Sequence, residues 1–453
     1  MEVVGRVEAT MKLLHTGDWH VGKVLKGMSR AEEHSAVLAE MVDVADREQV
    51  DAVLVAGDVF ESAAPPPEAQ RVAWKTLLDL RETGAEVFVI AGNHDNAEAF
   101  EALRPVFSSA GVHMLGRPAR PDQGGVVEVV TRAGEPLRVA ALPFCSQRSI
   151  VRAEQLMSMD ASELAGEYSE RVNRLIGSLV GTFTIDAVNV VLTHAYVLGG
   201  RLGGGERDAQ TVNDYAVRAT GFPAGASYVA LGHLHRFQQI PGPCPIHYAG
   251  SPIAVDFGEE RDDKGVALVE LAPGRPASVS HRILTNARTL ATVKGTADEA
   301  IAAATSQPEA WFRAVITESA RAGLADDIRT AAPNVLEVRL DGPHGWKPKG
   351  RGESGPRQGR TPRDLFGTYL EQQGIVDDRI VALFDELLDA EAAAGRDAEM
   401  AAGRTDDVVD AEEWVDGTGD SLVALVSRAS AAPPGTRSAA AIEARSAASE
   451  STL

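Results

Sequence analysis

Over residues 11–100 the chain alternates short apolar runs with longer stretches of helical periodicity. The runs "KLLHT", "DAVLVA" and "EVFVIA" are largely continuous in apolar residues, which is typical of strands buried on both faces. Between them, residues 29–50 predict a helix capped by Ser29, and residues 65–84 predict a helix that starts with proline and ends at glycine. Alternation of buried strands with helices predicts an α/β sheet core.

Further apolar runs predict strands in the second half of this core. They lie at residues 137–144, 187–195, 227–235, 245–252 and 265–271. The glycine-rich residues 199–207 predict a loop. Residues 288–341 then predict strand, helix, strand, helix, strand, which is a small α+β unit of its own.

The pattern divides the chain into a large core and several smaller parts. We expect the following boundaries: a disordered extension at 1–10, a core domain at 11–285, a capping domain at 286–342, a basic linker at 343–363, a helical segment at 364–394, and an acidic, then Ala/Ser-rich, disordered tail at 395–453. The helical segment shows two short amphipathic helices, which need a partner surface for their apolar faces.

The formal net charge is −21, which opposes binding to nucleic acid because duplex DNA requires neutralisation of its phosphates. The charge is unevenly distributed, however. Residues 365–453 carry 18 acidic and 6 basic side chains, so −12 of the −21 lies in the last fifth of the chain. Residues 347–363 carry six basic side chains and one acidic, and are either a flexible hinge or a strap that contacts phosphate. Nucleic acid therefore remains a possible substrate.

Two cysteines, Cys145 and Cys244, are too few for a disulfide framework and lack metal-binding spacing, so we expect reduced thiols in a cytoplasmic protein. No apolar run reaches about 18 residues, so we expect no transmembrane helix. The first ten residues lack the apolar core of a signal peptide. We expect no membrane association, and we take Met11 as the natural start.

Five predicted strands end in side chains that can bind a metal ion. The motifs are "GDWH", "GDVFE", "GNHD", "TH" and "GHLH", and each follows an apolar run. They supply Asp18, His20, Asp58, Asn93, His94, Asp95, His194, His233 and His235. Ligands bind at the carboxyl ends of strands in open α/β sheets, so five such ends in one chain predict a metal site.

The donor types limit the choice of metal. No thiolate is present, which argues against a structural zinc site, whereas carboxylate, imidazole and amide donors together suit manganese, iron or zinc in a catalytic site. The donors are too numerous for one ion. We therefore predict two divalent ions about 3.5–4 Å apart, with Asp58 as the bridging carboxylate and a shared, acidified water as nucleophile.

The five motifs resemble the signature of the calcineurin-like metallophosphoesterases. "MKLLHTGDWHVGK", "YVALGHLHRFQQI" and "HYAGSPIAVDFGEERDDKGVALVEL" are more closely similar to the nuclease subunits of double-strand-break-repair complexes. This resemblance covers about residues 11–390 and implies a four-layer α/β/β/α sandwich with a small α+β capping domain. It also implies C-terminal helices that dock on the coiled-coil base of an SMC-like ATPase in a two-to-two complex.

The same resemblance implies a role for each motif residue. One ion would be held by Asp18, His20, Asp58 and His235, and the other by Asp58, Asn93, His194 and His233. His94 would stabilise charge on the phosphate or protonate the leaving oxygen, Asp95 would orient His94, and the metal would be manganese. Glu61 departs from the pattern, because some archaeal relatives have a histidine there, and its role stays open.

These features together predict a hydrolase: a two-metal DNA exonuclease and endonuclease that acts on ends and hairpins in DNA repair, recombination and replication. The chain has no P-loop motif, so ATP would be handled by the partner. Two alternatives stay open. A phosphodiesterase acting on a small molecule would explain the acidic core but not the docking helices. An assembly subunit with a structural metal site would have no need of His94.

Overall fold

The computed structural model describes residues 10–341, except 133, 147–149, 151–167, 205, 207–215, 274, 276, 320 and 322. The predicted N-terminal extension, apart from Thr10, lies outside the described residues. The predicted basic linker, helical docking segment and acidic tail also lie outside them.

The core contains two six-stranded sheets, and the first has the strand order β14-β13-β1-β4-β5-β6. Its members are β1 (Met11–Thr16), β4 (Ala52–Val55), β5 (Glu86–Ile90), β6 (Val112–Leu115), β13 (Gly265–Leu271) and β14 (Ser278–Ile283). The strands β1, β4, β5 and β6 run parallel, whereas β13 pairs antiparallel with both β1 and β14. The four parallel strands are almost entirely buried, as the apolar sequences of β1, β4 and β5 predicted, whereas β6 was not predicted.

The second sheet has the order β11-β12-β10-β9-β8-β7. Its members are β7 (Val126–Val130), β8 (Pro136–Leu142), β9 (Val188–His194), β10 (Tyr228–Gly232), β11 (Gln238–Ile240) and β12 (Ile246–Tyr248). Here β8, β9, β10 and β12 are parallel, and the edge strands β7 and β11 are antiparallel. The predicted α/β class is confirmed, with two mixed sheets.

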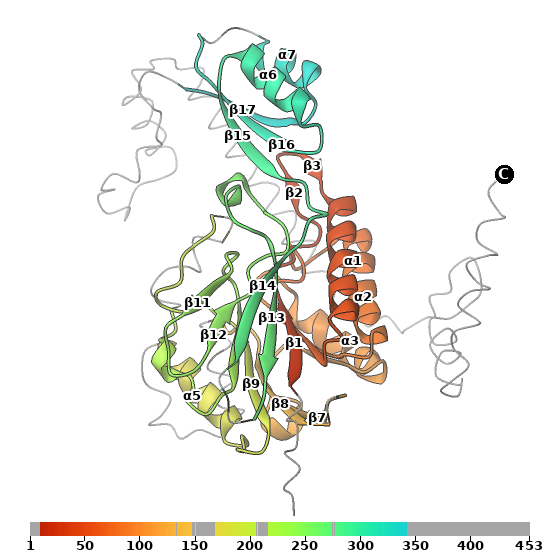
Figure 1. Cartoon of the computed structure of the whole chain (residues 1–453), viewed down its shortest axis with the longest axis vertical. Helices are drawn as coiled ribbons and strands as arrows, with labels where there is room; N and C mark the ends of the chain where they lie inside the picture. Colours follow the sequence, from red (N-terminus) through yellow and green to blue (C-terminus); the bar gives the residue numbers. More distant parts are fainter. Residues whose placement is uncertain are drawn as a thin grey trace, which may run out of the picture. The chain divides into compact units, whose positions relative to one another are not determined.

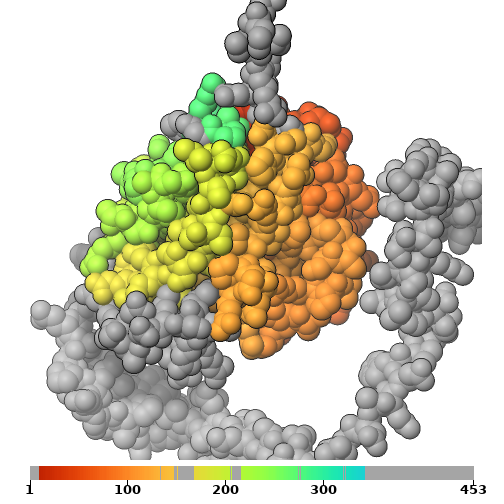
Figure 2. Space-filling model, turned by 90° about the horizontal axis from the view of Figure 1, so that it is seen from below, coloured from red at the N-terminus to blue at the C-terminus, as the bar shows by residue number. Residues whose placement is uncertain are grey.

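The two sheets pack face to face through an apolar layer that includes Leu13, Leu54, Val139 and Leu192. The helices α1 (Ala31–Arg47), α2 (Pro67–Glu82) and α3 (Ala97–Ser109) cover the outer face of the first sheet (Figure 1). Helix α5 (Tyr168–Val180) covers the second sheet. Seen from below, the orange residues near 100–140 and the yellow residues near 170–195 lie next to each other on this face of the molecule (Figure 2). No described helix is long and apolar enough to span a membrane.

The start of α1 differs from the sequence prediction. Ser29 does not cap the helix but lies in β3 (Met28–Ser29), which pairs with β2 (Val24–Leu25) in a short hairpin. The N-cap is Arg30, which makes no side-chain cap hydrogen bond, and its buried guanidinium pairs with Glu33 instead. Pairing within the hairpin therefore overrides the local preference of serine for capping.

The chain then forms a three-stranded parallel sheet of order β15-β16-β17 with two helices. Its elements are β15 (Leu290–Gly295), α6 (Ala297–Ser306), β16 (Trp311–Ile316), α7 (Leu324–Ala331) and β17 (Val335–Leu340). This order confirms the strand and helix alternation predicted for residues 288–341. A small apolar cluster joins Leu290 and Leu336 of this sheet to Leu25, Ala254 and Phe257.

Candidate metal centre

The predicted ligands lie together, each just beyond or at the carboxyl end of a parallel strand. Asp18 and His20 follow β1, Asp58 follows β4, Asn93 follows β5, His194 ends β9, and His233 and His235 follow β10. All the histidines and carboxylates among them are buried. Together with His94, they form overlapping groups that could each hold a metal ion: Asp18, His20 and His235; His20, Asp58 and His94; and Asp58, His194 and His233.

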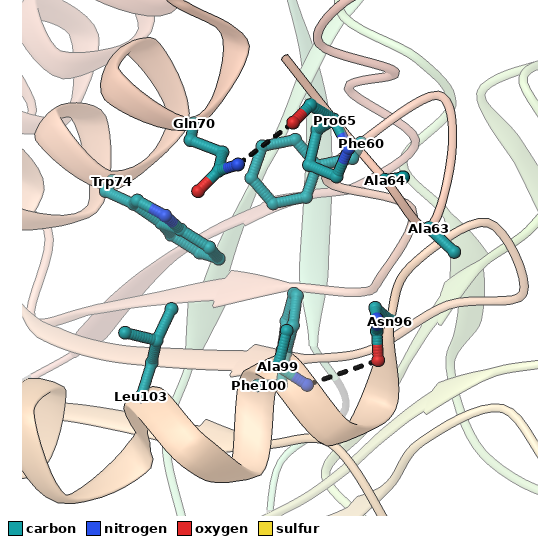
Figure 3. A pocket seen from close by; sticks show the side chains of 10 residues that line it. All are labelled: Phe60, Ala63, Ala64, Pro65, Gln70, Trp74, Asn96, Ala99, Phe100 and Leu103. Atoms are coloured by element: carbon teal, nitrogen blue, oxygen red, sulfur yellow. Dashed lines mark hydrogen bonds between the residues drawn. The ribbon is translucent and has the colours of Figure 1, made fainter. Parts of the chain in front are cut away.

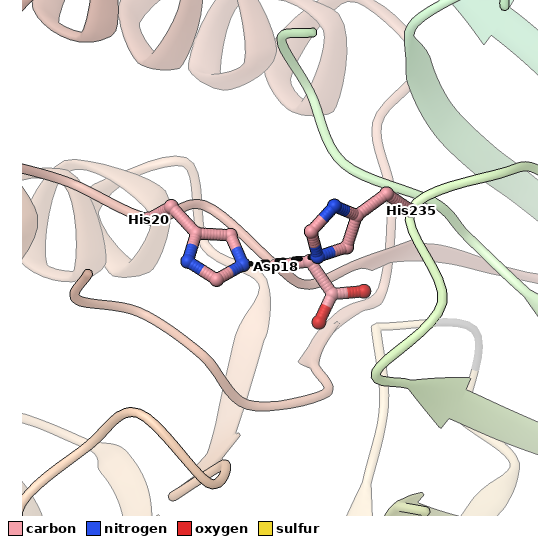
Figure 4. Close-up of side chains that lie close together, drawn as sticks. All are labelled: Asp18, His20 and His235. Carbon is pink, nitrogen blue, oxygen red and sulfur yellow. Dashed lines mark hydrogen bonds between the residues drawn. The ribbon is translucent and has the colours of Figure 1, made fainter. Parts of the chain in front are cut away.

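The first set of predicted ligands is Asp18, His20 and His235 (Figure 4). The Nε2 atoms of His20 and His235 are 3.1 Å apart. The Nδ1 atom of His20 lies 2.9 Å from Oε2 of Glu61, and that of His235 lies 2.8 Å from Oε1 of Glu259. Because each Nδ1 donates to a carboxylate, both Nε2 lone pairs in the neutral rings point at each other. A cation between them, either a proton on one ring or a metal ion, would remove this repulsion, so the first set fits a metal ion.

The second set contains Asn93, His194 and His233. The Nδ1 atom of His194 donates to the Ala56 carbonyl oxygen at 2.8 Å. Its Nε2 lies 2.8 Å from Oδ1 of Asn93, which is also 2.8 Å from Nδ1 of His233. In neutral His194 both Nε2 and the amide oxygen are acceptors, so this close approach also favours a cation.

Asp58 lies between the two sets. Its Oδ2 atom is 3.4 Å from Nε2 of His194 and 3.9 Å from Nε2 of His20. Its Oδ1 atom accepts a hydrogen bond from the backbone amide of His94 at 2.8 Å. One carboxylate thus approaches an imidazole of each set, which is the arrangement that a bridging ligand requires.

The backbone around the site is in an unusual conformation. Among the described residues, six that are not glycine have positive φ, and four of the six are predicted ligands: Asp18, His20, Asp58 and His233. Such conformations cost energy and persist where the surrounding structure holds them, most often at functional sites. Gly92 allows the close approach of two strand ends, because a Cβ there would lie 2.1 Å from Oδ1 of Asp58.

Asp95 contacts main-chain amides in the described structure. Its carboxylate accepts hydrogen bonds from the backbone amides of Val59, Phe60 and Gly92, at 3.2, 2.9 and 2.8 Å. The Nδ1 atom of His94 instead donates to the carbonyl oxygen of Glu61 at 2.7 Å. Asp95 therefore ties the β4 and β5 loops together, and the main chain of Glu61 orients His94.

Burial and neighbouring carboxylates shift the pKa values of the histidines in opposite directions. Burial lowers the pKa of His20 to about 4. Burial also disfavours protonation of His194, but Asp58 and Asp18 outweigh it and raise the pKa of His194 to about 9. The pKa of His235 likewise rises to about 9, because Glu259 and Asp18 outweigh burial. In the metal-free protein, protons on two imidazoles thus balance part of the carboxylate charge, and a bound cation would replace them.

Two acidic side chains that contact the site were not identified from sequence, Glu206 and Glu259, whereas Glu61 was noted there without a role. Glu206 accepts from the backbone amide of His235 at 3.2 Å. Glu259 is fully buried beside Lys264, with 2.6 Å between Oε2 and Nζ. In the sequence, Glu259 stands among other acidic and basic residues after "IAVDF", and nothing there indicates burial or a partner.

A cavity of about 290 Å³ lies beside the site but contains none of its predicted ligands (Figure 3). Phe60, Trp74 and Phe100 form its apolar walls, and Asn96 lies at its edge, where it caps α3. The cavity adjoins the loop that carries Glu61, because Phe60 precedes that residue. Its lining has no charged group, so it is not the place where a phosphate would bind.

Comparison with known proteins gives the family. The calcineurin-like phosphoesterase family matches residues 11–237. SbcD, a subunit of the SbcCD nuclease, from Bacillus subtilis is 32% identical over 83% of this chain and 97% of that protein. The proteins of the same name from Rhodobacter capsulatus and Escherichia coli are 36% and 30% identical, over 58% and 66% of this chain and 67% and 74% of theirs.

Among solved structures, a dimetal phosphatase from Danio rerio is similar with a TM-score of 0.36 and 12% identity, over 60% of this chain and 99% of that one. Membership of the family rests on the sequence relatives, since the first of them aligns along nearly its whole length. The chain therefore belongs to the calcineurin-like phosphoesterase family, and within it is a homologue of the SbcD nuclease subunit.

Proposed function

We propose that the chain is a metal-dependent DNA nuclease subunit that acts on DNA ends and hairpins together with an SbcC-like coiled-coil ATPase. The observation that carries this proposal is the assembly of seven predicted ligands from five strand ends, with Asp58 between two sets. The relatives named as SbcCD nuclease subunits support the substrate class and the partner.

The seven predicted ligands would hold two metal ions. Asp18, His20, Asp58 and His235 would hold one divalent ion, and Asp58, Asn93, His194 and His233 the other, with manganese as the expected metal. When bound, the two cations would acidify a water molecule and offset the negative charge that develops on the phosphodiester. The carboxylate of Asp58 would be shared by both positions and so keep them a fixed distance apart.

His94 would act on the substrate rather than on the metal. Its Nδ1 atom is engaged by the Glu61 carbonyl, so any contact with the phosphate or the leaving oxygen must be made through Nε2. A proton on Nε2 could be donated to the leaving oxygen or could stabilise charge on the phosphate. His94 is also close enough to His20 and Asp58 to ligate a metal, so metal retention in a His94 variant distinguishes the two roles.

The remaining parts of the chain would serve the complex. We propose residues 286–342 as a capping domain beside the active site, and residues 364–394 as the segment that docks on the ATPase. A two-to-two complex follows from the same proposal. Residues 364–394 lie outside the described residues, so their docking role depends on their amphipathic sequence and on the relatives' names.

The decisive experiment is cleavage of end-labelled linear and hairpin DNA with added Mn²⁺, alone and with the SbcC-like ATPase. A generic phosphodiester ester is assayed in parallel, and Asp58→Ala is the inactive control. We expect DNA cleavage that is lost in Asp58→Ala and increases when the ATPase and ATP are added. Ester hydrolysis without DNA cleavage, even with the ATPase present, would contradict the proposal and favour a phosphodiesterase of the same fold that acts on small molecules.

A further inference from the structure

A pair of oppositely charged side chains is buried directly behind His235. Glu259 lies in the short 3₁₀ turn Phe257–Glu259 and its side chain is 0% exposed, whereas Lys264 precedes β13 and its side chain is 7% exposed. Their Oε2 and Nζ atoms are 2.6 Å apart. Burying two charges is costly, and apolar side chains of similar volume are often at least as stabilising. Stability alone therefore gives a weak reason for this pair.

The pair contacts His235 at two separate points. Glu259 accepts from the ring through its Oε1 atom, 2.8 Å from Nδ1. Lys264 donates to the main-chain carbonyl oxygen of His235 at 2.8 Å, and also to Oγ of Ser251 at 3.0 Å. Ser251 in turn donates its backbone amide to the same carbonyl of His235 at 3.1 Å. Ring and backbone of one predicted ligand are thus held by a single buried unit.

The other carboxylate oxygen keeps this unit rigid. Oε2 of Glu259 accepts from the backbone amide of Val255 at 3.1 Å in addition to the ammonium of Lys264. The carboxylate is thus fixed by main chain on one side and by Lys264 on the other. Because its position is fixed, it holds the proton of a neutral His235 ring on Nδ1 and directs Nε2 toward Nε2 of His20, 3.1 Å away.

We propose that Glu259 and Lys264 form a positioning unit that holds His235 as an Nε2 ligand and thereby sets the affinity of the first ion. This proposal rests on the two-ion site of the proposed function and adds to it a residue pair outside the ligand set. It is specific to one half of the site, because the corresponding ring atom of His194 is held by the Ala56 main chain and not by a carboxylate.

The test is Mn²⁺ binding to Glu259→Gln, measured by calorimetry and by electron paramagnetic resonance. Glutamine keeps the length of the side chain but removes its charge. Loss of such an outer contact typically weakens metal binding about 10–100-fold. We expect a weakening of this size for one ion and no change for the other. At two Mn²⁺ per chain, the spectrum of a coupled ion pair should give way to that of isolated ions.

The matched control is Glu260→Gln, one residue further along the chain. Glu260 accepts a hydrogen bond from Oγ1 of Thr292 in the small sheet and does not contact His235 in the described structure. We expect this variant to bind both ions as the wild type does. Because Glu259→Gln leaves Lys264 without its charged partner, Glu259→Gln/Lys264→Met is made as well. It removes both charges and repeats the test if the single variant does not fold.

Any of three results would overturn the proposal. One is folded Glu259→Gln that binds both ions with wild-type affinity and gives the coupled spectrum. The second is equal weakening of both ions with a lower melting temperature of the metal-free protein. The third is failure of both variants to fold. In either case the pair would serve folding only. A wild-type chain that binds fewer than two Mn²⁺ ions would instead contradict the proposed two-ion site.

Discussion

The two halves of the candidate metal centre orient their imidazoles by different means. In the first set, both rings donate Nδ1–H to a carboxylate that is paired with a lysine: Glu61 with Lys23 behind His20, and Glu259 with Lys264 behind His235. In the second set, His194 donates to the main-chain carbonyl of Ala56. The first half therefore depends on charged side chains and the second on the path of the backbone.

This difference has consequences for how each half responds to change. A carboxylate makes the imidazole that it contacts a more basic ligand, and it can be removed by one substitution. A main-chain carbonyl increases the basicity of the imidazole less. It cannot, however, be removed without altering the backbone that carries it. We therefore expect the affinity of the first ion to be sensitive to substitutions outside the ligand set, and that of the second to be insensitive to them.

The largest expected effect is on both halves at once, because Asp58 approaches imidazoles of both. We expect Asp58→Ala to lose both ions and all turnover, since neither half keeps its shared carboxylate. Metal content after dialysis and DNA cleavage measure this. Asp43→Ala, which removes an exposed carboxylate on α1, is the control and should behave as wild type. Retention of two tightly bound ions in Asp58→Ala would show that the residue does not bridge.

His94→Ala separates catalysis from metal binding in both halves. We expect both ions to stay bound, while turnover falls about 10²–10⁴-fold, the usual contribution of a positioned proton donor. Cleavage rate and Mn²⁺ stoichiometry are measured on the same sample. His113→Ala, which removes a histidine outside the site, should cleave normally. Loss of one ion in His94→Ala would identify His94 as a ligand, and wild-type turnover would remove its proposed role.

Lower pH should weaken metal binding in both halves, because each contains an imidazole that is protonated in the metal-free protein. The pKa values of His194 and His235 are about 9 there, so a cation must displace a proton from each below that pH. Apparent affinity should fall up to about tenfold per pH unit for each displaced proton as the pH decreases below 9. Calorimetry in two buffers of different ionisation enthalpy measures the protons released, and equal heats in both buffers would contradict this.

The stability of the metal-free protein should change with pH in the opposite direction to metal binding. A folded-state pKa of about 9 lies above the ordinary value of 6.5, so protonated His194 stabilises the metal-free fold fully below about pH 6.5. This contribution is lost as the pH rises through about 9. Metal-free protein should therefore become less stable over the range in which metal binding becomes tighter, which thermal unfolding with a chelator would show.

The smallest expected effect is the difference in affinity for the first ion between variants of the two charged pairs in the first half. Glu61 and Lys23 are partly exposed, with side-chain exposures of 29% and 23%, whereas Glu259 and Lys264 are buried. Water can replace part of the contact of Glu61 with His20, so Glu61→Gln should weaken the first ion less than Glu259→Gln does. Glu61→Gln leaves intact the contact between the main-chain carbonyl of residue 61 and Nδ1 of His94. The same Mn²⁺ titration measures both variants, and a larger effect in Glu61→Gln would reverse the ranking.

Much of the fold was predictable from local patterns. The strands β1, β4, β5, β9 and β10 are continuous apolar runs, and the alternation over residues 288–341 was confirmed element by element. Helix α3 was not predicted, since Pro105 interrupts its pattern, and neither was α5. The Ser29 cap was wrong because the hairpin β2–β3 forms across positions that sequence reasoning treats as independent.

The identity of the candidate ligands was determined by the sequence alone, because each lies at or just beyond the end of a buried strand, most of them in short motifs that begin with glycine, where a short-range pattern marks them. The groups that orient them were decided by tertiary structure. Glu259 lies 24 residues from His235, and Ala56 lies 138 residues from His194. A hydrogen bond between such positions depends on how two sheets pack face to face, and no local pattern of apolar and polar residues carries that information.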